Sequence, residues 1–413
     1  MSLKSRLSCL QRQAGVGPVA PKPSVSTLRE RIAQLETRGR SRNCAADRKA
    51  PTHPSLEELA RTLGGERIAD GLIRIHRRLS LQGRLGSIPL QSLQPDPRLP
   101  GERESRGLRQ LYIDTETTGL SGGSGTLAFL IGVAVLDGAR LELTQFLLTR
   151  FGAEADLLSA FAESLSPDDR LVSYNGKSYD LPLLATRFRM HSLPAPFAGL
   201  PHLDLLHPVR RLFGRRWNDC RLTTLEQRLL GFGRVDDLPG SEAPAAWFAY
   251  VRFGHSRPLI GVVAHNRQDV LSLAVAHSAL AEAAVRPRAF GVDLYALARW
   301  LAEHREAEAC ELLQASQSEL CDDGQRLLAR LLRRAGRWQQ AVPIWEALAA
   351  RGCIDSLERL AKYHEHVSRD LAAARRCCEA LSADAAHERR RRRVQLKLER
   401  LRKRRTAVPG GID

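Results

Sequence analysis

Several features that assign proteins to particular classes are missing from this 413-residue sequence. The longest apolar run, residues 127–136, has ten residues, about half of what a membrane-spanning helix needs. The N-terminus, Met-Ser-Leu-Lys-Ser-Arg at residues 1–6, lacks the continuous apolar stretch of a signal peptide. The eight cysteines form no Cys-x-x-Cys pair, which argues against a zinc site or a disulfide framework. We therefore expect a cytoplasmic protein with reduced thiols and no membrane association.

Acidic residues are scarce at the two ends of the chain, whereas the middle is not basic. Residues 1–110 contain 21 Lys and Arg against 10 Asp and Glu, and residues 388–405 contain 11 against 2. Because the whole chain carries +17, residues 111–387 are left with −2 once Asp413 is counted. A solvated charge run is the usual explanation of such ends. With the acidic motifs described next, we instead expect a nucleic-acid partner, DNA or RNA, attracted from a distance.

The most informative segment is Asp-Thr-Glu-Thr-Thr-Gly-Leu at residues 114–120, which follows three apolar residues. The apolar run predicts a buried strand, and side chains repeat every two residues along a strand, so Asp114 and Glu116 share one face. Two neighbouring carboxylates repel each other unless cations lie between or beside them. Mg²⁺ and Mn²⁺ are the natural partners of oxygen-only clusters. The alternative is a half-exposed strand with two solvated acids.

Further acidic residues occur where a metal site would need them. Asp180 lies in the first turn of a helix that we expect after an Asn-Gly turn, with Ser178 as its N-cap. The helix N-terminus would tend to keep Asp180 ionised. His265 and Asp269 open another helical pattern and, being four residues apart, share a helix face. Each residue alone has an ordinary structural explanation, but together they place four carboxylates and an imidazole on three elements.

These motifs resemble those of the DEDD exonucleases of the ribonuclease H-like fold. The resemblance is closer still to the bacterial YprB-type proteins, which combine such a domain with a tetratricopeptide-like C-terminal region. It covers residues 111–280. The matching segments are the first motif at 114–120, the second at 174–184 (Tyr-Asn-Gly-Lys-Ser-Tyr-Asp-Leu-Pro-Leu-Leu), an intermediate strand at 202–205 and the last motif at 265–270 (His-Asn-Arg-Gln-Asp-Val).

The resemblance implies a metal-dependent 3′–5′ exonuclease that hydrolyses phosphodiester bonds of DNA or RNA with two Mg²⁺ or Mn²⁺ ions. Carried over residue by residue, the implied metal ligands are Asp114, Glu116, Asp180 and Asp269, and the candidate general base is His265. Contacts to the terminal nucleotide are expected from Thr117, Thr118, Gly119 and Asn175.

The spacing of His265 departs from the family pattern. In the histidine branch of these exonucleases, four residues separate the base from the last Asp, whereas three separate His265 from Asp269. Three is the spacing of the tyrosine branch. A general base must come within hydrogen-bond reach of the attacking water, so the sequence alone does not decide whether His265 is that base.

The order of the expected elements favours an α/β fold. Three sequential strands near 111–149, followed by alternating helices and strands to about 285, predict a ribonuclease H-like mixed sheet with flanking helices. Ala307, Ala341 and Ala374 lie 34 and 33 residues apart, the tetratricopeptide period, with an ordinary helical bundle as the alternative. The expected regions are a basic, largely disordered N-terminal region at 1–65, a ribonuclease H-like exonuclease domain at 66–285, an all-α tetratricopeptide-like region at 290–387 and a basic tail at 388–413.

Two other functions fit the same sequence. A nucleic-acid-binding protein could keep the fold with a weak or inactive site, although the presence of all four acids argues against this. An adaptor could act through its helical repeats, which would then bind a protein partner. Neither alternative changes the expected fold.

Overall fold

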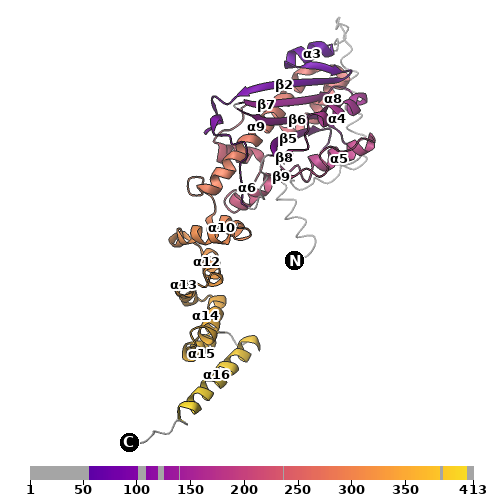
Figure 1. Ribbon diagram of the computed structural model, residues 1–413. Helices are drawn as coiled ribbons and strands as arrows, with labels where there is room; N and C mark the ends of the chain where they lie inside the picture. The colour runs from indigo at the N-terminus through magenta and orange to yellow at the C-terminus, as the bar shows by residue number, and fades with distance from the viewer. Residues whose placement is uncertain are drawn as a thin grey trace, which may run out of the picture. The chain divides into compact units, whose positions relative to one another are not determined.

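The computed structural model describes residues 55–100, 108–119, 125–138, 140–235, 237–381 and 385–406. The chain divides into two compact units, and the division at residues 282–283 falls within helix α9 (Ser256–Val285). Unit 1 contains a mixed sheet with flanking helices, and unit 2 is helical (Figure 1). Among the described residues, no helix has the length and apolar character needed to cross a membrane.

Unit 1 is built on a seven-stranded sheet with the spatial order β1-β2-β7-β6-β5-β8-β9. Its strands are β1 (Glu66–Ala69), β2 (Leu72–Ser80), β5 (Arg109–Thr117), β6 (Ala128–Asp137), β7 (Arg140–Leu148), β8 (Asp169–Ser173) and β9 (His202–Asp204). β5 pairs in parallel with β8, and β8 with β9, while the other neighbours are antiparallel. A short ribbon of β3 (Arg84–Leu85) and β4 (Ile88–Pro89) lies outside this sheet. The predicted mixed sheet is therefore confirmed.

Strand register shows which helix covers which face of the sheet. Gln145 of β7 donates a hydrogen bond to Asn266 of α9, whereas the next residue, Phe146, lines a groove with residues of α4. Because neighbouring side chains on a strand point to opposite faces, α9 covers one face and α4 the other. The helices of unit 1 are α3 (Leu56–Leu63), α4 (Glu154–Glu163), α5 (Asp180–Met190), α6 (Leu206–Phe213), α7 (Leu222–Leu225), α8 (Ala243–Phe253) and most of α9, with the π-helix η3 (Glu226–Leu230) and 3-10 turns η1 (Leu90–Ser92), η2 (Phe151–Ala153) and η4 (Gly240–Glu242).

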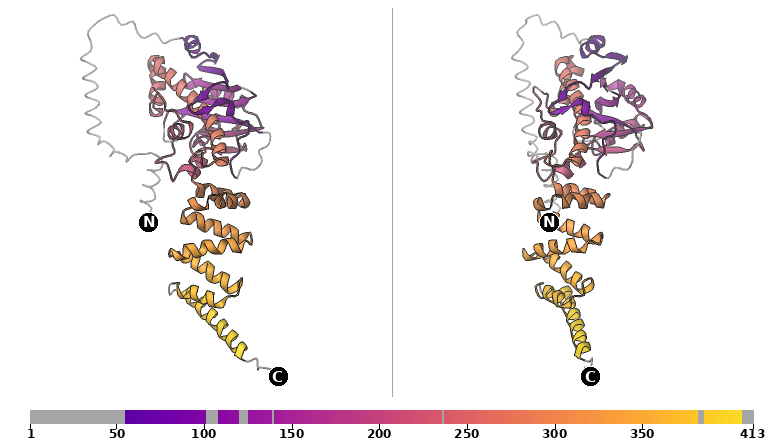
Figure 2. Two further views of the ribbon diagram at one scale, coloured as in Figure 1. Left: turned by 90° about the vertical axis from the view of Figure 1, so that its left-hand side faces the viewer. Right: turned by 60° about the vertical axis from the view of Figure 1, so that its left-hand side comes forward.

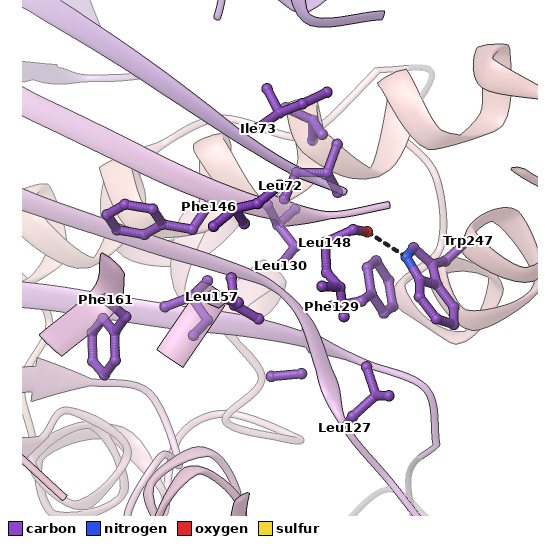
Figure 3. Packing of buried hydrophobic residues seen from close by; sticks show 14 of the residues in the cluster. Leu72, Ile73, Leu127, Phe129, Leu130, Phe146, Leu148, Leu157, Phe161 and Trp247 are labelled. Carbon is purple, nitrogen blue, oxygen red and sulfur yellow. Dashed lines mark hydrogen bonds between the residues drawn. The ribbon is translucent and has the colours of Figure 1, made fainter. Parts of the chain in front are cut away.

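Trp247 of α8 anchors that helix to the sheet (Figure 3). Its indole stacks on Phe129 of β6, with ring centroids 5.3 Å apart, and its Nε1–H donates to the Leu148 carbonyl at 2.6 Å. A buried indole needs such an acceptor, since an unpaired N–H in the core destabilises the fold. Gly254, at φ 72°, ends α8 in the left-handed region, and α9 begins at Ser256. The anchored α8 thus sets the entry of α9, which carries His265 and Asp269.

Two expected helix starts are wrong. Ser178 does not cap a helix, because α5 begins at Asp180 with Tyr179 as its N-cap and no side-chain capping bond. α9 begins at Ser256 rather than near His265. Pro258 falls in the first turn of α9. Proline is tolerated there, because backbone N–H groups in the first turn make no hydrogen bond within the helix. His265 and Asp269 therefore lie inside a long helix.

The ordered part of unit 1 begins before residue 66. Ser55 caps the first described helix of the unit, since its hydroxyl accepts from the Glu58 N–H at 3.1 Å at the start of α3. Leu59 and Leu63 of α3 are buried in the core of the sheet, although they precede the expected boundary at residue 65. Residues 66–69 form the edge strand β1, and residues 72–80 form its neighbour β2. The remaining expectation for the N-terminal region, at residues 1–54, lies outside the described residues.

Unit 2 consists of consecutive paired helices (Figures 1 and 2). They are α10 (Leu294–Ala302), α11 (Glu306–Gln314), α12 (Asp322–Arg334), α13 (Trp338–Ala350), α14 (Ile354–His366), α15 (Leu371–Glu379) and α16 (Ala385–Thr406), with the 3-10 turn η5 (Gln317–Glu319). Ala341 and Ala374 are fully buried, as expected, but Ala307 is exposed. Ala309 takes the equivalent buried position in α11, fourth from the helix start as in α13 and α15. The tetratricopeptide character of these pairs remains a prediction.

The basic helix α16 packs onto the rest of unit 2 through its described side chains. Val394 is fully buried against Ala374 and Cys378. The buried Glu365 of α14 accepts hydrogen bonds from Arg393 and Lys397 at 2.7–2.8 Å. Burial alone would raise the pKa of Glu365, but these bonds lower it to about 2. Part of the positive charge of α16 is therefore used inside unit 2.

Candidate active site

Strand β5 presents the acids of the first motif near its C-terminal end. Asp114 pairs with Gly132 of β6, and Glu116 with Leu130. Both acids lie on the face covered by α9, because Asp114 accepts a hydrogen bond from α9 and Glu116 follows two residues later. Thr115 points to the opposite face and donates to the carboxylate of Asp180. Consecutive residues of one strand thus connect α9 and the start of α5.

Gly132 allows α9 to approach the sheet closely. Asn266 Nδ2 donates to Asp114 Oδ2 at 2.8 Å, and its Oδ1 accepts from Gln145 Nε2 at 2.8 Å. A Cβ at position 132 would lie 2.2 Å from Asn266 Oδ1, which is far inside contact distance. Any larger residue would push Asn266 away. Gly132 is therefore required for the bond that orients the Asp114 carboxylate.

Glu116, His265 and Asp269 meet at one point. One ligand atom from each lies within 4.8 Å of those of the other two. The Nε2 atom of His265 is 4.0 Å from Glu116 Oε1 and 3.4 Å from Asp269 Oδ2. The spacing of four residues puts the two side chains on the same face of α9. The imidazole therefore points into the acidic cluster.

Asp180 is held at the N-terminus of α5 by its neighbours. Its Oδ1 accepts from Thr115, and its Oδ2 lies beside Gly176. A Cβ at position 176 would come within 2.4 Å of the Ser173 hydroxyl and 3.3 Å of Asp180 Oδ2. The turn before α5 consequently needs a glycine here. The Asn-Gly turn is thus part of what positions Asp180.

The buried Asp204 at the end of β9 holds the same turn. Its Oδ1 accepts from the backbone N–H of Asn175 at 2.7 Å, and its Oδ2 from that of Lys177 at 3.1 Å. Asn175 adopts φ 66°, a left-handed conformation that asparagine tolerates better than most residues. Asp204 therefore fixes the approach of the chain to Asp180.

The residues expected to contact a nucleotide lie in two turns, one after β5 and one before α5. The Thr117 hydroxyl donates to the Gly119 carbonyl at 3.0 Å. The Thr118 hydroxyl accepts from the Leu127 N–H at 3.1 Å. These bonds stabilise the turn after β5, while Asn175 lies in the turn before α5. Their contact with a nucleotide remains a prediction.

Burial raises the pKa values of all four acids, and the charges of neighbouring carboxylates add to the shift. Burial, followed by the charges of Asp269, Asp180 and Glu116, raises the pKa of Asp114 well above its usual value. Burial and the charges of Asp269 and Asp180 raise the pKa of Glu116 to about 8. Burial raises the pKa of Asp180 to about 6 and that of Asp269 as well, although Arg234 opposes the latter shift. The carboxylates therefore form a buried cluster whose negative charge is only partly compensated, by Arg234 at Asp269.

Arg234 and Asp237 support the cluster, although no sequence motif indicated either. Arg234, with a side chain only 9% exposed, donates to Asp269, to Asp237 at 3.0 Å and to Glu226 of η3 at 2.7 and 2.8 Å. Both carboxylate oxygens of Asp237 lie 2.8 Å from His265 Nδ1. Burial would raise the pKa of Asp237, but the bonds from His265 and Arg234 lower it. The only feature of the sequence that could have indicated them is that an arginine, residue 234, precedes two consecutive aspartates, residues 236–237.

The contacts of His265 determine which nitrogen faces the acids. Because Nδ1 lies against the Asp237 carboxylate, we assign the proton of the neutral ring to Nδ1. This leaves the Nε2 lone pair directed toward Glu116 and Asp269. The ring is thus arranged to accept a proton on the side of the acidic cluster.

The donor set suits hard divalent cations. Oxygen atoms of carboxylates are the ligands that Mg²⁺ and Mn²⁺ prefer. Within the described ranges, one cationic side chain donates a hydrogen bond to a member of the four acids. It is Arg234, which donates to Oδ1 of Asp269. The raised pKa values show that these charges are poorly compensated. Bound cations would remove this repulsion, so the residues fit a metal centre.

The metal-free protein is expected to lose thermal stability between about pH 6.5 and 8. A carboxyl group with a higher pKa in the folded chain binds its proton more tightly when folded, so stability falls as pH rises between the unfolded and folded pKa values. For Glu116 this window runs from 4.5 to about 8. Melting at pH 8 should occur on the order of 5 °C below melting at pH 6.5, and Mn²⁺ should reverse the loss by binding the folded state.

The pH window from about 6.5 to 8 lies above the range in which two buried histidines affect stability, and their effect on stability is opposite in sign to that of Glu116. Burial lowers the pKa of His202 to about 4 and that of His277 to about 3. Protonation of these rings below about pH 6.5 would destabilise the fold. Glu116→Gln should flatten the dependence above pH 6.5. A melting temperature that rises from pH 6.5 to 8 in the metal-free parent would contradict the coupling of the acids.

Comparison with known proteins places this site within a family. Residues 111–281 match the family model described as the RNase H superfamily. The chain is 32% identical over 311 residues to the uncharacterized protein YprB of Bacillus subtilis (strain 168), and the match covers 71% of this chain and 74% of that protein. The chain belongs to the YprB family. Its unit 1 is accordingly a ribonuclease H-like domain, followed by a helical C-terminal region.

Two archaeal polymerases share more distant similarity. DNA polymerase 1 of Aeropyrum pernix is 29% identical over 143 residues, which cover 30% of this chain and 15% of the polymerase. The structure of the family B DNA polymerase from Pyrobaculum calidifontis matches with 14% identity and a TM-score of 0.35, covering 69% of this chain and 35% of the polymerase. The chain thus spans well under half of either polymerase.

Proposed function

We propose that this protein is a metal-dependent nuclease that hydrolyses phosphodiester bonds of DNA or RNA as a 3′–5′ exonuclease. The main support is the mutual burial of Asp114, Glu116, Asp180 and Asp269 beside His265 in a ribonuclease H-like domain. Buried acids whose pKa values are raised and whose charges are only partly matched by cations are typical of functional sites rather than of structural ion pairs.

The four acids are proposed to hold two Mg²⁺ or Mn²⁺ ions. When bound, such ions activate a water molecule and stabilise the leaving oxygen of an in-line displacement at phosphorus. The protein then needs no covalent intermediate. Asn266 and Thr115 keep the carboxylates of Asp114 and Asp180 oriented for this task.

His265 is proposed to act as the general base. Its Nε2 would take the proton of the attacking water, since Nδ1–H is already directed at Asp237. The Asp237 carboxylate would stabilise the imidazolium that forms. Arg234 holds Asp237 and Asp269 at their places beside the ring. Asp237 and Arg234 are thus positioning residues for the proposed reaction.

Degradation of end-labelled oligonucleotides tests the activity and its direction. With Mg²⁺ or Mn²⁺, single-stranded DNA or RNA labelled at its 5′ end should yield a ladder shortened from the 3′ end, whereas a 3′ label should be released first as a mononucleotide. A 3′-terminal block and EDTA should each prevent degradation. Internal cuts or release from the 5′ end would exclude the proposed direction. Binding of both substrates without cleavage would favour the inactive binding protein.

A further inference from the structure

Unit 2 contains a groove formed only by its own helices. The groove has a volume of about 310 Å³ and lies between residues of α10, α12, α13 and α14. Four of its nine lining residues are arginines, namely Arg326, Arg330, Arg333 and Arg359. A concentration of guanidinium groups in a concave surface attracts anions.

Three of the arginines form a row along α12. Arg326, Arg330 and Arg333 are spaced by four and three residues, so they lie on one face of the helix. The helical rise separates them by about 6 and 4.5 Å along the axis. The groove therefore presents a row of guanidinium groups rather than a single one.

Arg330 and Arg333 are available to an external ligand. Arg326 is bound to Asp323, and Arg359 donates to Asp355 at 3.3 Å. The guanidinium groups of Arg330 and Arg333 line the same groove and have no hydrogen bond or ion pair with another residue of the described chain. A guanidinium has five N–H donors and matches the geometry of a phosphate group.

The lining favours a phosphate backbone over a peptide. Leu327 and Trp345 are only 4% and 3% exposed because they belong to the core of unit 2. The ring of the partly exposed Tyr295 lies under Arg299, whose guanidinium is 5.7 Å from the ring centroid. Peptide ligands usually gain affinity from several apolar anchors that fill pockets, and the groove offers only the one partly exposed ring of Tyr295 among its lining residues. A phosphodiester backbone needs only repeated cationic contacts.

We propose that Arg330 and Arg333 bind the sugar-phosphate backbone of single-stranded nucleic acid, independently of base sequence. The choice of nucleic acid as the anion rests on the proposed nuclease function. The groove would then give the substrate of the acidic site a second contact on the same chain. Both DNA and RNA carry the recognised group.

Fluorescence anisotropy of labelled thymidine and uridine 20-mers tests the proposal. The full chain carrying Asp114→Asn is used in EDTA, so that the probes stay intact. Arg330→Gln with Arg333→Gln should weaken binding about tenfold and flatten the log–log salt dependence by about 1.4, or about 0.7 for each lost phosphate contact. The matched control, Arg375→Gln with Arg376→Gln, removes two exposed arginines of α15 and should leave the slope nearly unchanged.

Three results would overturn the proposal. Unchanged affinity and slope in the groove variant would show that the groove does not bind the backbone. Equal weakening in both double variants would show an effect of net charge alone. If a labelled deca-glutamate peptide, but not the oligonucleotides, lost affinity in the groove variant, the groove would serve an acidic protein segment.

A small substrate separates failure of the groove from failure of the nuclease. A p-nitrophenyl phosphodiester of thymidine has a single phosphodiester group and therefore no extended backbone to offer the groove. Its hydrolysis by protein that retains Asp114 should be unaffected by the groove variant. Absence of hydrolysis in the parent would count against the nuclease, whereas the binding measurements would still decide the groove.

Discussion

Replacing Asp114 or Asp180 with asparagine is expected to slow metal-dependent degradation of oligonucleotides by about 10³-fold or more, because each change removes a charged oxygen ligand worth several kcal/mol in the transition state. Side-chain size hardly changes. Asparagine at position 114 can still accept from Asn266, and at position 180 from Thr115. Initial rates with saturating Mn²⁺ would measure the effect.

The folded state should tolerate both changes. Because the pKa values of Asp114 and Asp180 are raised, the ionised carboxylates are unfavourable in the metal-free fold, and neutral amides relieve their repulsion. Melting temperatures without metal should therefore be equal to or above that of the parent. Asp168→Asn, at an exposed position before β8, is the matched control and should keep full activity. Parent-like degradation by either site variant would refute the metal-ligand assignment.

Replacing His265 with alanine is expected to lower the rate about 10²–10⁴-fold at neutral pH, the usual contribution of a general base. The expectation follows from the position of Nε2, 3.4 Å from Asp269 Oδ2 and 4.0 Å from Glu116 Oε1. Asp237→Asn should cause a smaller loss, because it keeps the ring in the site but weakens its orientation. Both variants should lower kcat more than they change KM.

Two comparisons make the histidine experiment decisive. His76→Ala removes an exposed imidazole from β2 and should leave the rate unchanged. If His265→Ala retains activity within about threefold of the parent, a general base contribution is excluded. The histidine would then only occupy the tyrosine-branch position beside Asp269.

Local periodicity accounts for what could be predicted from the sequence. Alternation along a strand placed Asp114 and Glu116 on one face, and the helical period placed His265 and Asp269 on one face. The mixed sheet, the helical C-terminal region and the family are confirmed by the structure and the comparisons. Which side chains share a face depends on backbone geometry within a few residues, so short patterns report it. The chemical roles of the site residues remain predictions.

Contacts between distant segments explain what the sequence did not indicate. Asn266 reaches Asp114 across 152 positions only because Gly132, on a third element, leaves space for it. Arg234 and Asp237 lie in an irregular segment before α8 and contact each other and His265. The local sequence pattern of that segment does not predict a contact with His265.

In unit 2, packing determined which alanine of α11 is buried at the position equivalent to Ala341, and it also determined how α16 is attached. Ala309, not Ala307, is buried, because α11 begins at Glu306. The sequence by itself determined which residues share a face of each element. Which of these faces pack against each other became clear from the tertiary structure, because packing depends on the complementary shapes and the burial of side chains across the whole fold.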